Sequence, residues 1–207
     1  NVSLCNESRG ADVDPTPVVG VLGLIDDLQK PPGLNLVDGS ELILIGETDP
    51  ELSGSQWAAR HGHRGRGTLP YVDLMKVDQA ASVLRQLVHN RLLDGVHDVS
   101  TGGVAVALGE MAVASGIGFV VGGIASHGEL FSESSGRAVI CVSPDNRDAV
   151  VEILDNSGVS YSRLGDAGGD RLVVEKLIDV SLEAAHEQWR NRLPDALGSG
   201  TVQDAAH

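Results

Sequence analysis

The segment 97–103, H-D-V-S-T-G-G, carries the strongest local signal for chemistry. It predicts a strand that ends in an acidic, hydroxyl-bearing turn, followed by a helix that opens at the paired glycines Gly102 and Gly103. The free N–H groups and the positive dipole end of a helix start favour phosphate, and glycine lets a ligand approach the backbone. At such a site Asp98 would supply an oxygen ligand to Mg²⁺, next to the hydroxyl of Ser100.

The same segment has a purely structural interpretation, which the spacing by itself favours. In that interpretation Ser100 is only the N-cap of the helix and Asp98 is only a turn residue. The segment is not a Walker loop, because no Gly-Lys-Ser/Thr follows it. Both interpretations stay open on the sequence.

A second polar cluster, residues 130–137 with the sequence L-F-S-E-S-S-G-R, directly precedes an apolar run. Its carboxylate, hydroxyls and guanidinium, from Glu133, Ser134, Ser135 and Arg137, can together line a polar ligand pocket. The alternative is a capped loop with a surface ion pair, and the residues by themselves favour that alternative.

Two further candidates carry weaker signals. At the start of the chain, the amide oxygen of Asn1 can bind a hard cation and the hydroxyl of Ser3 can hold a substrate oxygen. The loop 60–66 holds the one basic cluster of an acidic chain, and it fits a solvated loop better than a phosphate or partner site. No Ser-His-Asp, Cys-His or H-E-x-x-H arrangement is evident in the sequence.

The chain as a whole is acidic: its 207 residues include 15 Lys+Arg and 29 Asp+Glu, a formal net charge of −14 at pH 7. With only 3% aromatic residues, this charge argues against binding to nucleic acid or to an anionic membrane. The two cysteines form no paired motif, and neither a leader segment nor an apolar membrane span is evident, so we expect a cytoplasmic protein. Because it opens on a polar stretch without Met, the chain reads like a piece of a longer protein.

Hydrophobic patterning predicts the elements that position these residues. Helical spacing predicts helices at 74–92, with its apolar face through Leu74, Val77, Ala81, Leu84, Val88 and Leu92, and at 104–115, 145–156 and 181–192. Gly116 is expected to end the second of these helices and Ser181 to cap the last. Short apolar runs predict strands at 18–25, 41–46, 96–99, 138–142, 159–164 and 171–174.

The order of these elements predicts an α+β (mixed α/β) fold with helices packed on a mixed sheet. Residues 54–66 are expected to form an irregular loop. The proline pair within 29–33 predicts a domain boundary, because two prolines remove two backbone donors and fix two φ angles.

Five motifs, taken together and in this order, resemble the large synthetase subunit of phosphoribosylformylglycinamidine synthase, a member of the aminoimidazole ribonucleotide synthetase superfamily. They depart from the family pattern at Cys5, where Tyr is usual, at Thr101, where an acid is usual, and at Val104, where Leu is usual. The motifs are N-V-S-L-C-N-E at 1–7, P-T-P-V-V-G-V-L-G at 15–23, L-S-G-S-Q-W at 52–57, H-D-V-S-T-G-G-V at 97–104 and F-S-E-S-S-G-R at 131–137.

The resemblance implies a domain organisation. Residues 1–30 would be the end of a second N-type synthetase domain, and 36–195 a C-type domain with the C-terminal fold of aminoimidazole ribonucleotide synthetase. Residues 196–207 are expected to be a disordered tail. The missing N-terminal half of the same subunit would precede these domains and supply the catalytic residues, with none in this chain.

The resemblance also implies an activity and a set of ligands. The family reaction is the ATP-dependent conversion of formylglycinamide ribonucleotide to its amidine, with ammonia supplied by a glutaminase subunit and a small accessory subunit also bound. By motif, Asn1 would be a Mg²⁺ ligand and Ser3 a substrate contact. Internal pseudo-symmetry makes seven residues candidates for an auxiliary nucleotide, phosphate or Mg²⁺ site: Asp98, Ser100, Gly102, Gly103, Glu133, Ser134 and Ser135.

Two other hypotheses remain beside the ligase. The chain can be a non-catalytic scaffold that docks the first half and holds one structural nucleotide. It can also belong to another ATP-using member of the superfamily, such as thiamine-monophosphate kinase or selenophosphate synthetase, although the motifs at 15–23 and 52–57 speak against this. We expect the 207 residues by themselves to be inactive as a ligase.

Overall fold

A computed structural model describes residues 7–8, 10–13, 18–24, 31–63 and 67–198, and the chain divides into two compact units, Asn1–Lys30 and Pro31–His207. In the first unit, β1 (Glu7–Ser8) pairs antiparallel with β2 (Ala11–Asp12). The strand predicted at 18–25 is wrong for its described part: residues 18–24 form no regular element, and Leu22 is 98% exposed. An apolar run becomes a buried strand only where a second layer covers it.

Seven strands in the described part of the second unit form one mixed sheet, in the order β4-β6-β3-β7-β5-β8-β9. Neighbouring strands run antiparallel except β5 and β8, which are parallel. The predicted α+β class, with helices packed on a mixed sheet, is confirmed. The strands are β3 (Glu41–Ile45), β4 (Gly95–Asp98), β5 (Phe119–Val121), β6 (Ala138–Val142), β7 (Tyr161–Ala167), β8 (Arg171–Val174) and β9 (Ile178–Ser181).

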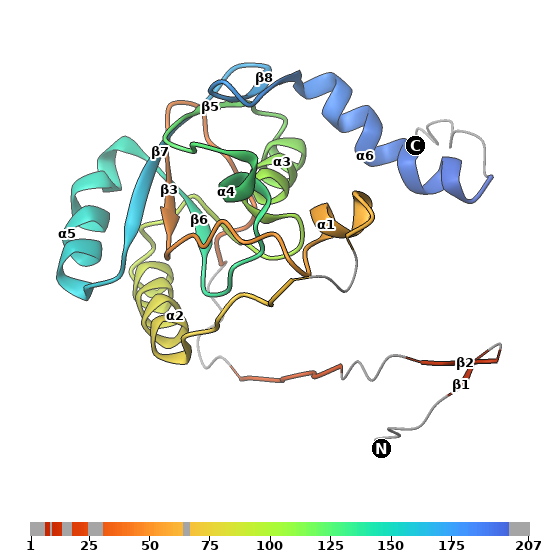
Figure 1. Cartoon of the computed structure of the whole chain (residues 1–207). Helices are drawn as coiled ribbons and strands as arrows, with labels where there is room; N and C mark the ends of the chain where they lie inside the picture. The colour runs from red at the N-terminus through yellow and green to blue at the C-terminus, as the bar shows by residue number, and fades with distance from the viewer. Residues whose placement is uncertain (1–6, 9, 14–17, 25–30, 64–66, 199–207) are drawn as a thin grey trace. The chain divides into compact units, whose positions relative to one another are not determined.

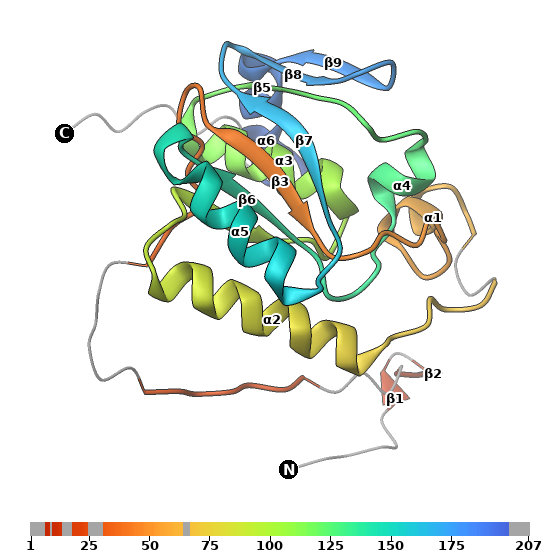
Figure 2. The ribbon, with the colours of Figure 1, turned by 90° about the vertical axis from the view of Figure 1, so that its left-hand side faces the viewer.

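Both faces of the sheet are covered by helices (Figures 1 and 2). Successive side chains of a strand point to opposite faces, so β3 contributes to two separate cores. Leu42 and Leu44 pack in the cluster that includes α3 (Gly103–Ser115), whereas Ile43 and Ile45 pack with α2 (Leu74–His89) and α5 (Arg147–Ser157). A strand buried on both faces explains why the sequence at 41–45 is an uninterrupted apolar run after Glu41.

The predicted helices are present, with one correction to the apolar face of α2. Its buried residues are Ala80, Val83 and Leu87, none of which belongs to the predicted apolar face. The predicted face lies beside this buried face, and its first residue, Leu74, is 76% exposed. The other helices follow prediction closely. In α3 the helix ends at Gly116 in the left-handed conformation, α5 follows a short 3₁₀ turn, Pro144–Asn146, and Ser181 caps α6 (Leu182–Ala196).

Besides β1 and β2 of the first unit, four short elements of the second unit were not predicted. The loop expected at 54–66 contains α1 (Gln56–Arg60), and α4 (His127–Phe131), β5 and β9 lie in stretches without a prediction. The helices α1 and α4 have five residues each, too few to show a period of 3.6, and the strands β5 and β9 have three and four residues. The tail expected at 196–207 lies outside the described residues after Gly198, and the domain assignments remain predictions. None of the helices within the described ranges is long and apolar enough to span a membrane.

Candidate functional site

The glycine turn of the segment 97–103 lies between the edge strand β4 and α3, as predicted. Gly102 is the N-cap of α3 with φ 84°, and Gly103 has φ 68°, a region that side chains other than glycine rarely adopt. A Cβ atom at Gly103 would lie 2.5 Å from the carbonyl oxygen of Ser132 and 2.7 Å from that of Leu130. Close packing of α3 against the end of α4 is therefore sufficient to require glycine at this position.

The carboxylate of Glu133 occupies the start of α3. Its Oε1 accepts a hydrogen bond from the N–H of Gly102 at 2.8 Å and another from the N–H of Gln56 at 2.8 Å. Gln56 is the first residue of α1, whose N-cap Ser55 accepts from the N–H of Ala58. One side chain thus supplies negative charge to the first turns of two helices, which is the charge that we expected from a phosphate.

Three of the sequence motifs meet at this carboxylate. Gln56 belongs to the motif at 52–57, Gly102 to the motif at 97–104 and Glu133 to the motif at 131–137. The sequence did not predict this contact, because 77 and 31 residues separate Glu133 from its two donors. The acidic residue in the motif at 131–137 and the helix start predicted in the motif at 97–104 were separate signals, and neither indicated that the two meet.

Asp98 and Ser100 form a small exposed network beside the turn. The Ser100 hydroxyl donates to Asp98 Oδ2 at 2.7 Å, and this bond, with the nearby His97 ring, lowers the pKa of Asp98. Ser100 is not the N-cap of α3, so that part of the structural interpretation is wrong. The His97 ring lies between two acids, with Nε2 2.7 Å from Glu110 Oε2 and Nδ1 3.3 Å from Asp98 Oδ1 without hydrogen-bond geometry.

Arg137 is buried and holds the polar loop that precedes β6. Its guanidinium donates to the carbonyl oxygens of Ser134 at 3.1 Å and Ser132 at 2.7 Å, and to Thr48 Oγ1 at 3.0 Å. Burial lowers the pKa of Arg137 to about 10, which leaves it protonated at neutral pH. The surface ion pair suggested for this loop is wrong: within the described residues, no carboxylate reaches ion-pair distance of Arg137.

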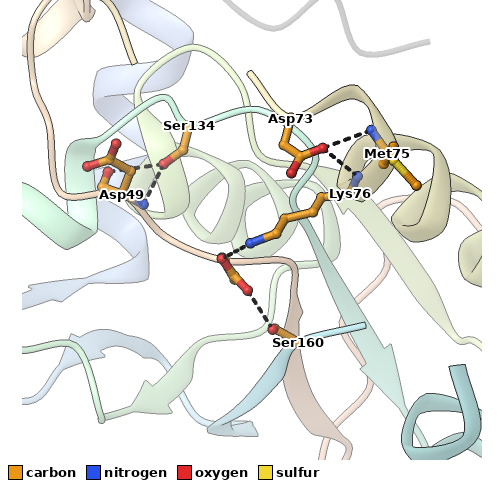
Figure 3. A network of polar contacts seen from close by, with 7 residues as sticks. Asp49, Asp73, Met75, Lys76, Ser134 and Ser160 are labelled. Carbon is orange, nitrogen blue, oxygen red and sulfur yellow. Dashed lines mark hydrogen bonds and ion pairs between the residues drawn. The ribbon is translucent and has the colours of Figure 1, made fainter. Parts of the chain in front are cut away.

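Ser134 and Ser135 line a polar cleft of about 340 Å³ beyond the end of β3. Figure 3 shows Ser134 and other polar residues of this cleft with their contacts. The Ser134 hydroxyl donates to the Asp49 carbonyl and accepts from its N–H, both at 3.1 Å. Across the cleft, Asp73 caps α2 by accepting from the N–H groups of Met75 and Lys76. The Lys76 ammonium lies 2.6 Å from Glu47 and thereby lowers the pKa of that carboxyl.

The seven candidate residues are therefore divided between two places. Glu133 points to the glycine turn with Gly102, whereas Ser134 and Ser135 face the cleft, whose lining includes neither Asp98 nor Ser100. Sequence reasoning missed the cleft residues Glu47, Asp73 and Lys76; only Asp73 carried a signal, as an N-cap before a periodic apolar pattern. Asn1 and Ser3 lie outside the described residues, as do Arg64 and Arg66 of the basic loop.

The described residues contain no group of three or more His, Cys, Asp or Glu side chains that could hold a metal ion. Asp98 is an exposed single carboxylate with one oxygen bonded to Ser100. Such a group fits a Mg²⁺ ion that takes its remaining ligands from water and phosphate, because Mg²⁺ is often held by only one or two carboxylates.

Residues 37–177 match the family model described as "AIR synthase related protein, C-terminal domain". The chain belongs to this family. The match lies within the second unit and covers the sheet from β3 to β8. The predicted relationship to the aminoimidazole ribonucleotide synthetase superfamily is confirmed.

Curated relatives of this AIR synthase C-terminal domain are larger proteins. The chain is 42% identical over 204 residues to "Phosphoribosylformylglycinamidine synthase subunit PurL" of Nocardioides sp., covering 96% of this chain and 26% of the relative. For the subunit of the same name in Moorella thermoacetica, identity is 38% over 202 residues, covering 94% and 28%. The chain thus spans about a quarter of the length of these relatives.

The fold is shared with a solved structure described as "T. maritima PurL complexed with FGAR". The TM-score is 0.64 at 16% identity, over 75% of this chain and 29% of that chain. At this identity the likeness concerns the fold, and it agrees with the C-terminal fold implied by the motifs.

Proposed function

We propose that the chain is the C-terminal part of an ATP-dependent ligase that converts formylglycinamide ribonucleotide and ammonia to formylglycinamidine ribonucleotide. The observation that carries this proposal is the 42% identity to a phosphoribosylformylglycinamidine synthase subunit over 96% of the chain. The T. maritima structure with FGAR supports the substrate class. Catalytic residues would come from the rest of the subunit, so the chain by itself would be inactive.

Asn1 and Ser3 would be the direct contribution of this chain to the ligase site. Their amide oxygen and hydroxyl suit a Mg²⁺ ligand and a substrate contact, respectively. The support is their place in the motif at 1–7, which resembles the family segment G-N-V-S-x-Y-N-E.

ATP and Mg²⁺ would be the cofactors, and solved T. maritima relatives include one complexed with ATP. In this chain, Asp98 with Ser100 fits a Mg²⁺–phosphate group, and Gly102 and Gly103 offer the helix start. Bound Mg²⁺ would neutralise phosphate charge. The Glu133 carboxylate must move away from the N–H of Gly102 before a phosphate could bind there. Ser134 and Ser135 would contact a ligand in the neighbouring cleft.

The partners would be the remainder of the same subunit, a glutaminase subunit and a small accessory subunit, in the cytoplasm. The solved "PurLQS" assembly of T. maritima supports the presence of further subunits.

A second function, as a non-catalytic scaffold, is favoured by one observation. Glu133 accepts from the N–H of Gly102 at the start of α3, and Arg137 donates to two carbonyl oxygens of the adjacent loop, so side chains of this chain already occupy these positions. In this case the C-type domain would stabilise the ligase without binding nucleotide itself.

The test is a chimera in which this chain replaces the stretch of the Nocardioides subunit that it matches. Expressed in a purine-requiring strain that lacks its own synthetase, the chimera should restore growth, and the Nocardioides subunit with the stretch deleted should not. Failure of a chimera that is folded and abundant would argue against the ligase proposal.

A further inference from the structure

A large groove is lined by residues of α3 and α6 and by Arg60 at the end of α1; the three helices are labelled in Figure 1. Its volume is about 1180 Å³, and it takes no part in the glycine turn or in the polar cleft. Its walls are mainly apolar: Ala105, Val106, Gly109, Val113, Ala185, Trp189, Leu193 and Ala196 line it, with Arg60, Glu110, Gln188, Arg192 and Asp195 as its polar members.

The wall formed by α6 is incompletely packed. Leu182 and Ala185, in its first turn, pack against the core, but none of the residues of this helix is buried. Trp189 and Leu193 follow Ala185 at four-residue intervals and are 60% and 67% exposed. Because a helix of this length is marginal in water without tertiary packing, the exposed stripe indicates a surface that is covered in the assembled protein.

The floor formed by α3 has the shape that a docking helix needs. One side of α3 is in the core through Val104, Leu108 and Met111, while Val106 faces outward at 37% exposure. A Cβ atom at Gly109 would meet nothing within 4 Å, so the floor is open at its centre. An apolar wall on α6 beside a floor on α3 that has a glycine at its middle fits the apolar face of an amphipathic helix.

The charged lining residues fit a protein partner. Two of them are basic, Arg60 and Arg192, and two are acidic, Glu110 and Asp195, so the charges that line the groove are balanced although the chain carries a net charge of −14. Glu110 is already engaged with His97. A mainly apolar lining with charged groups of both signs is typical of protein–protein contacts.

Resting on the proposed function, we propose that this groove receives an apolar helical surface from the part of the ligase subunit that lies outside the stretch matched by this chain. That part is about three quarters of the relatives' length, since the chain covers 26% of the Nocardioides subunit. The family model ends at residue 177, before α6, whereas the match to the Nocardioides subunit covers 96% of the chain. The helix α6 therefore lies outside the domain that the family model describes but inside the stretch that matches the longer relatives.

The test uses as its probe the part of the Nocardioides subunit that lies outside the matched stretch. Interferometry measures the binding of this probe to the purified 207-residue chain, and thermal melting checks that the probe is folded. Leu193→Asp should weaken binding at least 10-fold, because it places a charge in the apolar contact. The matched control is Leu197→Asp: Leu197 is the C-cap residue of the same helix and is 70% exposed but does not line the groove, and a change below 2-fold is expected.

Three results would overturn the inference: a folded probe that does not bind the wild-type chain, equal binding by Leu193→Asp, or a dimer of the chain alone that Leu193→Asp dissociates. The dimer, detected by light scattering, would assign the groove to a second copy. If the parts bind but the mixture has no ligase activity, the docking stands and the proposed function fails. If Leu193→Asp leaves both binding and activity intact, the function stands and the docking fails.

Discussion

At the glycine turn, one carboxylate oxygen of Glu133 accepts hydrogen bonds from the starts of α1 and α3. A charge-assisted bond to a backbone N–H at a helix start is stronger than a neutral one, and the helix dipole adds to it. Glu133 therefore links three chain segments, and we expect its replacement to lower the stability of the fold.

Glu133→Ala should lower the free energy of unfolding by about 0.5–2 kcal/mol, because it removes the side-chain acceptor of two helix-start N–H groups. Glu133→Gln keeps an oxygen at the same place and should lose less than half as much. Urea unfolding of the three proteins measures both differences. Equal stability of all three would contradict the role given to Glu133.

Asp98 allows a pH prediction at the same scale. The Ser100 hydroxyl is the largest cause of its lowered pKa, so Ser100→Ala should raise the pKa of Asp98 toward its ordinary value. A depressed carboxyl pKa adds stability above the unfolded pKa, and this stability is lost as the pH falls through the folded pKa. Ser100→Ala should reduce that acid-side contribution, which is modest because the side chain is largely exposed.

Carbon NMR titration of the Asp98 carboxyl gives this pKa directly. The control is Ser181→Ala, which removes the cap of α6 and should leave the Asp98 titration in place. An unchanged titration in Ser100→Ala would show that another group lowers the pKa.

At the scale of elements, the two glycines of α3 have opposite roles. Gly103→Ala would bring a Cβ against the carbonyls of Ser132 and Leu130 at a positive φ, so we expect a loss of about 3 kcal/mol or more. Gly109→Ala adds a methyl group into open space within the same helix and should raise stability by about 0.5–1 kcal/mol. Thermal unfolding of both variants measures the contrast, and equal effects would contradict this packing of α3.

The sequence predicted correctly those helices and strands whose apolar pattern and end residues match the way they pack in the structure. The sequence predicts β6 and β8 with their observed bounds, and Ser181 and Gly116 mark the ends of α6 and α3 as expected. The apolar face of α2 could not be placed correctly, because an exposed Leu74 is as apolar as a buried Leu87. Which residue is covered depends on the neighbouring α5 and sheet.

The sequence indicated the separate segments of the candidate site but not the contacts between them. The motifs at 97–104 and 131–137 were identified from residue types and the motif at 52–57 from the family resemblance, and the glycine turn lies at the start of α3 as expected. The sequence could not show that Glu133 contacts Gly102 and Gln56, because long-range contacts depend on how the sheet brings the loops together. The division of Ser134 and Ser135 from Asp98 has the same cause.

At the scale of the whole molecule, the second unit has the AIR synthase C-terminal fold and carries two surfaces that the chain itself leaves open, a polar cleft and an apolar groove. The curated relatives extend well beyond the stretch that it matches. Under the proposed function, ligase activity would lie in an assembly to which this chain contributes one domain and the motif at 1–7.

The most direct measurement of this claim is phosphate release from Mg²⁺-ATP with formylglycinamide ribonucleotide and ammonium. It compares the 207-residue chain with the same chain joined to the remainder of the Nocardioides subunit. The account predicts no substrate-dependent release by the chain and turnover by the joined protein. Turnover by the 207 residues by themselves would contradict it, because the catalytic groups would then have to lie within this chain.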